Sequence, residues 1–352
     1  MFKAFFWGDH WKHRIRAWSG AAVLLLVLFA QVRIAVAFNA WNGTFFDTLT
    51  HATSRPSAEL WSGLALLAWI ALGDIVFGTV AGYGGSVYAL WWRQALTEYY
   101  MPLWKQCSHR IEGASQRIQE DPSELAGIVE GIGMDFCRSL LTLFAFLPVL
   151  WALGSRLSFF GIDWPGTLAL IALAASVASI GISWLVGAHL PKLEYDNQAA
   201  EAAFRKQLVF AEEQRSLIEA GRGWSPLFRE VVSNYHRLFR HYGYFNGWSV
   251  SYDKFVMLLP YALCIPSLSD GTVTIALLMQ IVNAFGEVQG GFSFVRKNWT
   301  RVTKFRSVSR RLREFELGLA ATDVTNDPKI IWLPTLREFH DRNFERDLKG
   351  QF

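Results

Sequence analysis

Long uncharged apolar stretches constrain this chain more than any other feature of its sequence. Four stretches, residues 17–32, 139–155, 164–190 and 255–269, carry no charged residue. Residues 271–286 are also uncharged, and residues 60–92 contain only Asp74. A bilayer core of about 30 Å is crossed by about 20 mainly apolar helical residues. The sequence therefore predicts an all-α integral membrane protein with about six transmembrane helices, the fifth and sixth needing a few flanking residues each.

The composition agrees with this prediction. Of 352 residues, 52% are hydrophobic and 18% are charged, whereas soluble domains carry about a quarter charged residues. Intrinsic disorder and a disulfide-stapled secreted module are excluded. The formal net charge of +4 is small, and it indicates no nucleic-acid partner.

Lys and Arg alternate between the expected loops. The segment before the first span has four of them, the first loop has only Arg55 and the third only Arg156, while the second and fourth loops and the C-terminal segment are basic. Because cytoplasmic loops carry the excess of Lys and Arg, the pattern predicts that both termini are cytoplasmic.

Two helices are expected to extend well below the membrane. Helical periodicity continues from Leu168 to about Glu219, with a kink at Pro191. Asp121 followed by Pro122 is typical of a helix start, with Glu124 completing a capping box. We expect a transmembrane transport domain over residues 1–316 and a cytoplasmic tail over residues 317–352.

Acidic residues on these extensions are the candidates for proton exchange. Glu194, Glu201 and Glu212 point within about 20° of one direction on a helix. Carboxylates in a partly dry cavity have raised pKa values and exchange protons near neutral pH. A solvated helix face with a Glu201–Arg205 pair explains the same spacing.

Three other carboxylates stand in apolar surroundings. Glu130 lies within a run of small and apolar residues, where a carboxylate is costly unless it faces water or a partner. Asp74 and Glu287 have no partner nearby in the sequence. A functional role for Glu130 therefore competes with simple pairing to another helix.

Motifs of enzymes are absent from the sequence. It has no P-loop, no H-E-x-x-H zinc motif and no G-x-S-x-G nucleophile motif. The segment after Glu316 has too few residues for an ATPase domain. We expect no enzymatic activity, no metal site and no cofactor other than protons as the coupling ion.

Several polar segments resemble the SbmA/BacA peptide-antibiotic transporters of bacterial inner membranes. The matching segments, in one order from about residue 10 to residue 316, are Glu98-Tyr-Tyr-Met101, residues 109–121, residues 143–150, Glu201-Ala-Ala-Phe-Arg-Lys206, residues 242–246, residues 270–274 and residues 310–316. Chance similarity between hydrophobic helices does not produce matches of this polarity.

The resemblance implies a homodimer with an ABC-exporter-like membrane core that lacks a nucleotide-binding domain. It implies import of peptides across the inner membrane, including proline-rich antimicrobial peptides and peptide-like antibiotics, driven by the proton gradient. The family's proton-relaying carboxylates match Glu120, Glu130, Glu201 and Glu212, and Arg117 and Phe146 fit the pattern beside them. We add Glu194 and Glu287 as cavity residues, although Glu287 stands where the family is expected to have an amide.

Two other functions compete with peptide import. The chain could be the transmembrane subunit of an ATP-driven exporter of lipids or acyl chains, with a separate ATPase docked on its cytoplasmic helices. It could also be a non-transporting membrane scaffold. Co-purification of an ATPase would favour the exporter, and an absence of substrate flux under any gradient would favour the scaffold.

Overall fold

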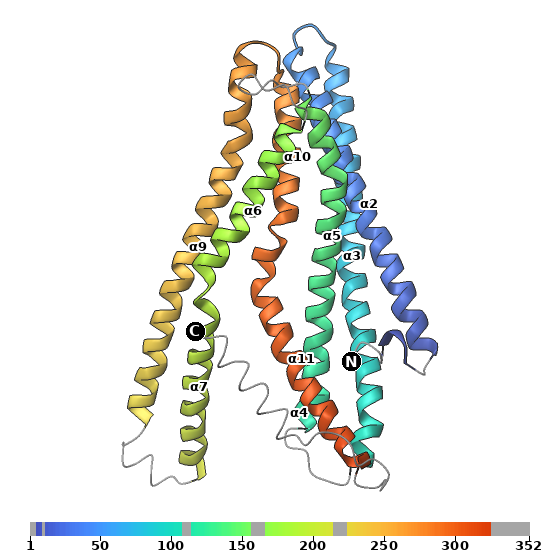
Figure 1. Ribbon diagram of the computed structural model, residues 1–352. Coiled ribbons are helices and arrows are strands. Elements are labelled where there is room, and N and C mark those ends of the chain that lie inside the picture. Colours follow the sequence, from blue (N-terminus) through green and yellow to red (C-terminus); the bar gives the residue numbers. More distant parts are fainter. Residues whose placement is uncertain (1–4, 9–10, 108–113, 156–165, 214–223, 325–352) are drawn as a thin grey trace. The chain divides into compact units, whose positions relative to one another are not determined.

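The computed structural model describes residues 5–8, 11–107, 114–155, 166–213 and 224–324. Within these ranges the regular secondary structure is helical, with no strand. The helices are α2 (Trp11–Thr50), α3 (Ser57–Gln106), α4 (Ala114–Gln119), α5 (Asp121–Gly154), α6 (Thr167–Gly187), α7 (Leu190–Glu213), α9 (Trp224–Ser269), α10 (Ile275–Phe292) and α11 (Phe294–Val324) (Figure 1). The all-α prediction is confirmed for this part of the chain.

Four helical segments are long and apolar enough to cross a membrane. They are Trp11–Thr50, Ser57–Gln106, Arg117–Gly154 and Thr167–Val209, and they contain the first four expected spans. The fifth and sixth expected spans lie in the second half of α9 and in α10, which are not among the four. Both are short uncharged stretches bordered by carboxylates at Asp253, Asp270 and Glu287, so six spans stay a prediction.

The chain divides into two compact units, which we describe separately. Unit 1 comprises residues 1–23, 83–132 and 300–352, and unit 2 comprises residues 24–82 and 133–299. Helix α11 belongs mainly to unit 1 and continues past the expected domain boundary at residue 316.

The predicted helix start at residue 121 is confirmed. Helix α5 begins at Asp121 with Pro122 in its first turn, where a missing backbone N–H costs nothing. The carboxylates do not act as the expected caps, because Asp121 and Glu124 pair with cations of α11. The Glu124 N–H instead donates to the Glu120 carbonyl.

The long helix predicted from Leu168 is interrupted once. Its hydrogen-bonded pattern stops after Gly187 and resumes at Leu190, while Ala188 keeps right-handed helical angles of φ −56° and ψ −32°. Pro191 has no N–H for the Gly187 carbonyl and its ring crowds that carbonyl. The expected kink is thus confirmed, and the expected helical end near Glu219 lies outside the described residues.

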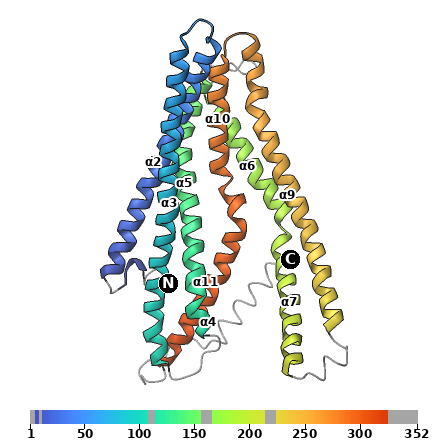
Figure 2. The same cartoon turned by 180° about the vertical axis from the view of Figure 1, so that it is seen from behind.

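Unit 2 is organised around α9. This helix packs against α6, α7 and α10, and it runs alongside α6 and α7 in both views (Figures 1 and 2). The core contains Phe146 and Leu150 of α5, Tyr252 of α9, and Ile281 and Phe285 of α10. Polar contacts join the same helices, since the Tyr252 hydroxyl donates to the Ala175 carbonyl.

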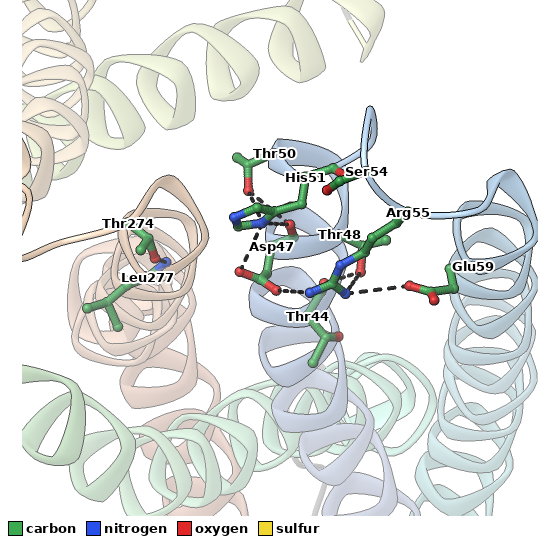
Figure 3. Close-up of polar contacts among 10 residues, drawn as sticks. All are labelled: Thr44, Asp47, Thr48, Thr50, His51, Ser54, Arg55, Glu59, Thr274 and Leu277. Atoms are coloured by element: carbon green, nitrogen blue, oxygen red, sulfur yellow. Dashed lines mark hydrogen bonds and ion pairs between the residues drawn. The ribbon is translucent and has the colours of Figure 1, made fainter.

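Turns of unit 2 are closed by local polar contacts (Figure 3). Arg55 follows α2 and pairs with Asp47 at 3.0 Å and with Glu59 of α3 at 3.5 Å. Thr274 caps α10, with its hydroxyl accepting from the Leu277 N–H at 3.2 Å. Gly271 has a φ of 73° in the preceding turn, a conformation that glycine adopts without steric cost.

Candidate functional site

The first group of candidate residues lies in unit 1, where α4, α5 and α11 meet. Asp121 is buried, and its carboxylate accepts from Arg311 Nη2 at 2.7 Å and from Arg117 Nη1 at 3.1 Å. Glu124 pairs with the same Arg311 at 3.1 Å and with Lys304. Hydrogen bonding to Asp121 raises the pKa of Arg311 above its ordinary value, so this guanidinium remains charged.

A cavity of about 490 Å³ opens beside this ion-pair group. Its lining residues are Arg93, Ser115, Gln119, Glu120, Ser123 and Glu124. The predicted proton-coupling residue Glu120 is exposed here. Arg117 does not line this cavity, since its guanidinium is directed to Asp121. Two carboxylates and one guanidinium therefore face water-accessible space.

Glu130 occupies a narrow niche further along α5. It is half-buried, and its Oε1 lies so close to Gly85 of α3 that any Cβ at position 85 would clash with it. Arg301 of α11 lies near the backbone of the adjacent Gly131. The carboxylate thus lies directly against the backbone of Gly85, in apolar surroundings where a charged group is costly.

The second group of candidate residues lies on α7 in unit 2. Glu194 and Glu201 are partly buried, and the Tyr242 hydroxyl of α9 donates to Glu194 Oε2 at 3.4 Å. Burial and the nearby Glu194 raise the pKa of Tyr242, so its hydroxyl stays protonated and able to donate. Glu212 is in α7, and its side chain lies outside the described part of the chain.

Glu287 of α10 borders a second cavity of about 490 Å³ in unit 2. Asp253, Asn283, Gln289 and Lys297 also line this cavity. The charges of Arg138 on α5 and Asp74 on α3 act on Glu287, and Arg138 donates to Gln31 of α2 at 2.6 Å. Asp74 and Glu287, which have no partner in the local sequence, therefore lie within electrostatic range of each other, and Glu287 also lies within range of Arg138.

Phe146 is a core residue in unit 2. Its exposed fraction is 0%, and it packs with residues of α5, α6, α9 and α10. Its expected place beside the transport cavity stays a prediction. Among the described residues, no three His, Cys, Asp or Glu side chains are grouped closely enough to hold a metal ion.

Sequence reasoning missed the cationic partners of α5. Arg311 and Asp121 are 190 residues apart, and no local pattern relates them. It also missed Gly85, although the Gly84-Gly85 pair inside an apolar helix could have indicated a close approach.

These long apolar helices, with carboxylates along them, define a helical membrane protein. A model of the SbmA/BacA-like family matches residues 9–320, and the chain belongs to this family. It is also similar to the inner membrane ABC transporter ATP-binding protein YddA of Escherichia coli, with 26% identity over 87% of this chain and 58% of the relative.

The chain is also similar to a plant protein. The chain is 26% identical to ABC transporter D family member 2, chloroplastic, of Arabidopsis thaliana, over 88% of this chain and 44% of the relative. The chain thus spans about half the length of the curated relatives it matches.

Proposed function

We propose that this chain is a proton-gradient-driven importer of peptides in the bacterial inner membrane. It works as a homodimer with six spans in each protomer and both termini in the cytoplasm. Its cargo includes proline-rich antimicrobial peptides and peptide-like antibiotics, and it carries out no chemical conversion of them. Membership of the SbmA/BacA-like family and the four long apolar helices support this proposal.

The observation that carries the proposal is the position of Glu130. Its carboxylate is half-buried in an apolar stretch of α5 and lies directly against Gly85. A carboxylate in such a place is costly when charged, so its protonation responds to any change in hydration. A group of this kind is suited to bind a proton in one state of a transporter and to release it in another.

Other carboxylates would continue the proton pathway. Glu120 lies exposed at the unit 1 cavity, from which a proton can reach bulk water. Glu201 and Glu212 extend along α7. Glu194 and Glu287 would contact the cargo, because both are partly buried and Glu287 borders the unit 2 cavity.

Reconstitution in liposomes tests the proposal. With an imposed pH gradient, the purified protein should move protons, reported by a lumenal pH-sensitive dye, together with a labelled proline-rich peptide. A protonophore should stop the uptake. Glu130→Gln should abolish both signals while keeping the size-exclusion profile of the wild type. Glu314→Gln is the matched control, since it removes a carboxylate from an exposed pair and should leave transport unchanged.

Two results would contradict this proposal. Transport that depends on ATP and on a co-purifying ATPase would identify the transmembrane subunit of an exporter. Full activity of Glu130→Gln and of Glu201→Gln would eliminate the proton pathway described here.

A further inference from the structure

The cavity of about 490 Å³ in unit 2 is formed by residues of α9, α10 and the start of α11. Its walls are partly apolar, with side chains such as Met257 and Val282. Gly286 and Gly290 of α10 also line it, and a Cβ added at either glycine would meet nothing within 4 Å. The cavity therefore has open space directly beside Glu287.

The neutral polar side chains of this cavity already use donors within the protein. Asn283 donates its amide to Asn39 of α2 at 2.9 Å, and Gln289 donates to a backbone carbonyl of α6 at 3.2 Å. The Ser293 hydroxyl donates to a backbone carbonyl of α10 at 2.7 Å. In all three contacts the side-chain oxygen takes no part as an acceptor, so these oxygens can still accept hydrogen bonds. The cavity thus offers mainly acceptors.

The charge of the cavity is negative. Among the described residues that line it, Asp253 and Glu287 are carboxylates and Lys297, which is exposed, is a cation. Glu287 is half-buried, and no hydrogen bond or ion pair of its carboxylate is found within the described part of the chain.

The nearby guanidinium of α5 does not neutralise Glu287. The charge of Arg138 acts on Glu287, but Asp74 offsets part of this effect. The Arg138 guanidinium itself donates to Gln31 at 2.6 Å. A half-buried carboxylate without an ion pair is costly, and a cationic ligand would lower that cost.

We propose that this cavity receives an arginine side chain of the peptide cargo. The inference rests on the proposed peptide import and names the group that the cavity recognises. A guanidinium is always charged and has five N–H donors, so it can donate to Glu287 and to the neighbouring acceptors together. Its hydration is weaker than that of an ammonium, which favours arginine over lysine in a partly apolar cavity. An anionic ligand would meet acceptors and a negative charge.

Equilibrium binding of labelled peptides to the full chain in nanodiscs tests this inference. Two proline-rich, otherwise neutral peptides are compared, with arginine in one and citrulline at the same place in the other. Citrulline keeps the shape of the side chain but has no charge. Wild type should bind the arginine peptide about tenfold more tightly, as expected for a hydrogen bond to a charged group. Glu287→Gln should bind both peptides equally, and its binding of the citrulline peptide reports that the variant is folded.

Matched variants separate the cavity from general surface charge. Asp270→Asn removes an exposed carboxylate near α10 that does not line the cavity, and it should keep the preference for arginine. Gly290→Ala places a methyl group in the open space of the cavity and should weaken binding of the arginine peptide. Gly247→Ala of α9, where a Cβ also meets nothing within 4 Å but does not line the cavity, should bind as wild type does.

Three outcomes would overturn the assignment. Equal affinity of wild type for the two peptides would show that the charge is not recognised. Equal losses in Asp270→Asn and Glu287→Gln would reduce the effect to surface charge. Loss of uptake in Glu287→Gln with an unchanged preference for arginine would assign Glu287 to proton binding instead.

Binding is measured without a pH gradient, so its result is distinct from that of the uptake experiment. A preference for arginine without gradient-driven uptake would retain the cavity assignment and contradict the proposed import. Uptake without any preference would contradict the cavity assignment alone.

Discussion

Units 1 and 2 differ in the contacts that join their helices. In unit 1, α11 is joined to α5 by Arg311 with Asp121, and to α3 by the Tyr100 hydroxyl, which donates to Glu316 at 2.8 Å. In unit 2, apolar side chains of four helices form the core, supplemented by amide contacts such as Asn283 to Asn39 at 2.9 Å. Ion pairs thus join α11 to α5 in the first unit beside buried side chains such as Leu96, Leu125 and Leu312, whereas the described contacts of α10 in the second unit are apolar or neutral.

Charged and apolar contacts depend differently on the solvent around them. Among lipid chains, an unpaired charge is costly, and close packing with neutral hydrogen bonds is the main source of helix association. Where water is nearby, the charged groups of an ion pair lose only part of their hydration, and water can supply the hydrogen bonds that the partner does not. The two units should therefore respond differently to core truncation and to loss of charge.

The largest effect should come from truncating the apolar core of unit 2. Phe146→Ala should lower the free energy of unfolding by about 3–5 kcal/mol, because it removes a fully buried aromatic ring. Phe144→Ala is the matched control, since Phe144 is 76% exposed two residues earlier. Denaturant unfolding in detergent measures both. Unchanged stability together with lost transport would instead place Phe146 beside the cargo pathway.

A slightly smaller effect should follow from breaking the ion-pair group of unit 1. Asp121→Ala leaves Arg311 without its strongest partner and should cost about 3 kcal/mol. The exposed pair of Arg310 with Glu314 provides the control, and Glu314→Ala should cost less than about 0.5 kcal/mol. Equal costs in the two variants would contradict the structural role given to Asp121. Thermal unfolding followed by tryptophan fluorescence checks this.

An intermediate loss of stability is expected at Tyr100, whose ring packs against α11 and whose hydroxyl donates to a carboxylate. Tyr100→Phe keeps the ring against Phe315 but removes the hydrogen bond to Glu316, at a cost of about 1 kcal/mol. Tyr99→Phe removes an exposed hydroxyl from the neighbouring residue and should be neutral. A neutral Tyr100→Phe would show that packing alone joins α3 to α11. Denaturant unfolding compares the two variants.

The smallest change in stability should accompany a large change in function. Gly85→Ala pushes the Glu130 carboxylate out of its niche, at a cost below about 1 kcal/mol because the end of a flexible side chain moves. Peptide uptake should nevertheless fall as it does in Glu130→Gln. Gly82→Ala, one turn earlier with nothing within 4 Å of the new Cβ, should transport normally. Equal uptake in the two variants would contradict the role of the niche.

The sequence predicts local features of this fold well. The start of α5 at Asp121 and the kink before Pro191 follow from the backbone chemistry of proline, which acts within one turn. The first four spans follow from length and apolarity. The fifth and sixth are less certain because carboxylates border their short apolar stretches.

Tertiary relations of the candidate residues could not be predicted in the same way. Periodicity places Glu124 in a first turn but does not show that Lys304 and Arg311 replace the cap interaction. Likewise, Gly82 and Gly85 are equivalent in a helical pattern, and only the position of Glu130 distinguishes them. These relations depend on which helices are neighbours.

The interruption between α6 and α7 has a mechanical consequence. One backbone hydrogen bond is missing across Ala188 and His189, because Pro191 has no N–H to donate to the Gly187 carbonyl. Bending the chain at these two residues therefore breaks fewer backbone hydrogen bonds than bending it elsewhere in α6 or α7. Since both α6 and α7 pack against α9, a bend at this joint moves the part of α7 that bears Glu194 and Glu201 together with the facing part of α9.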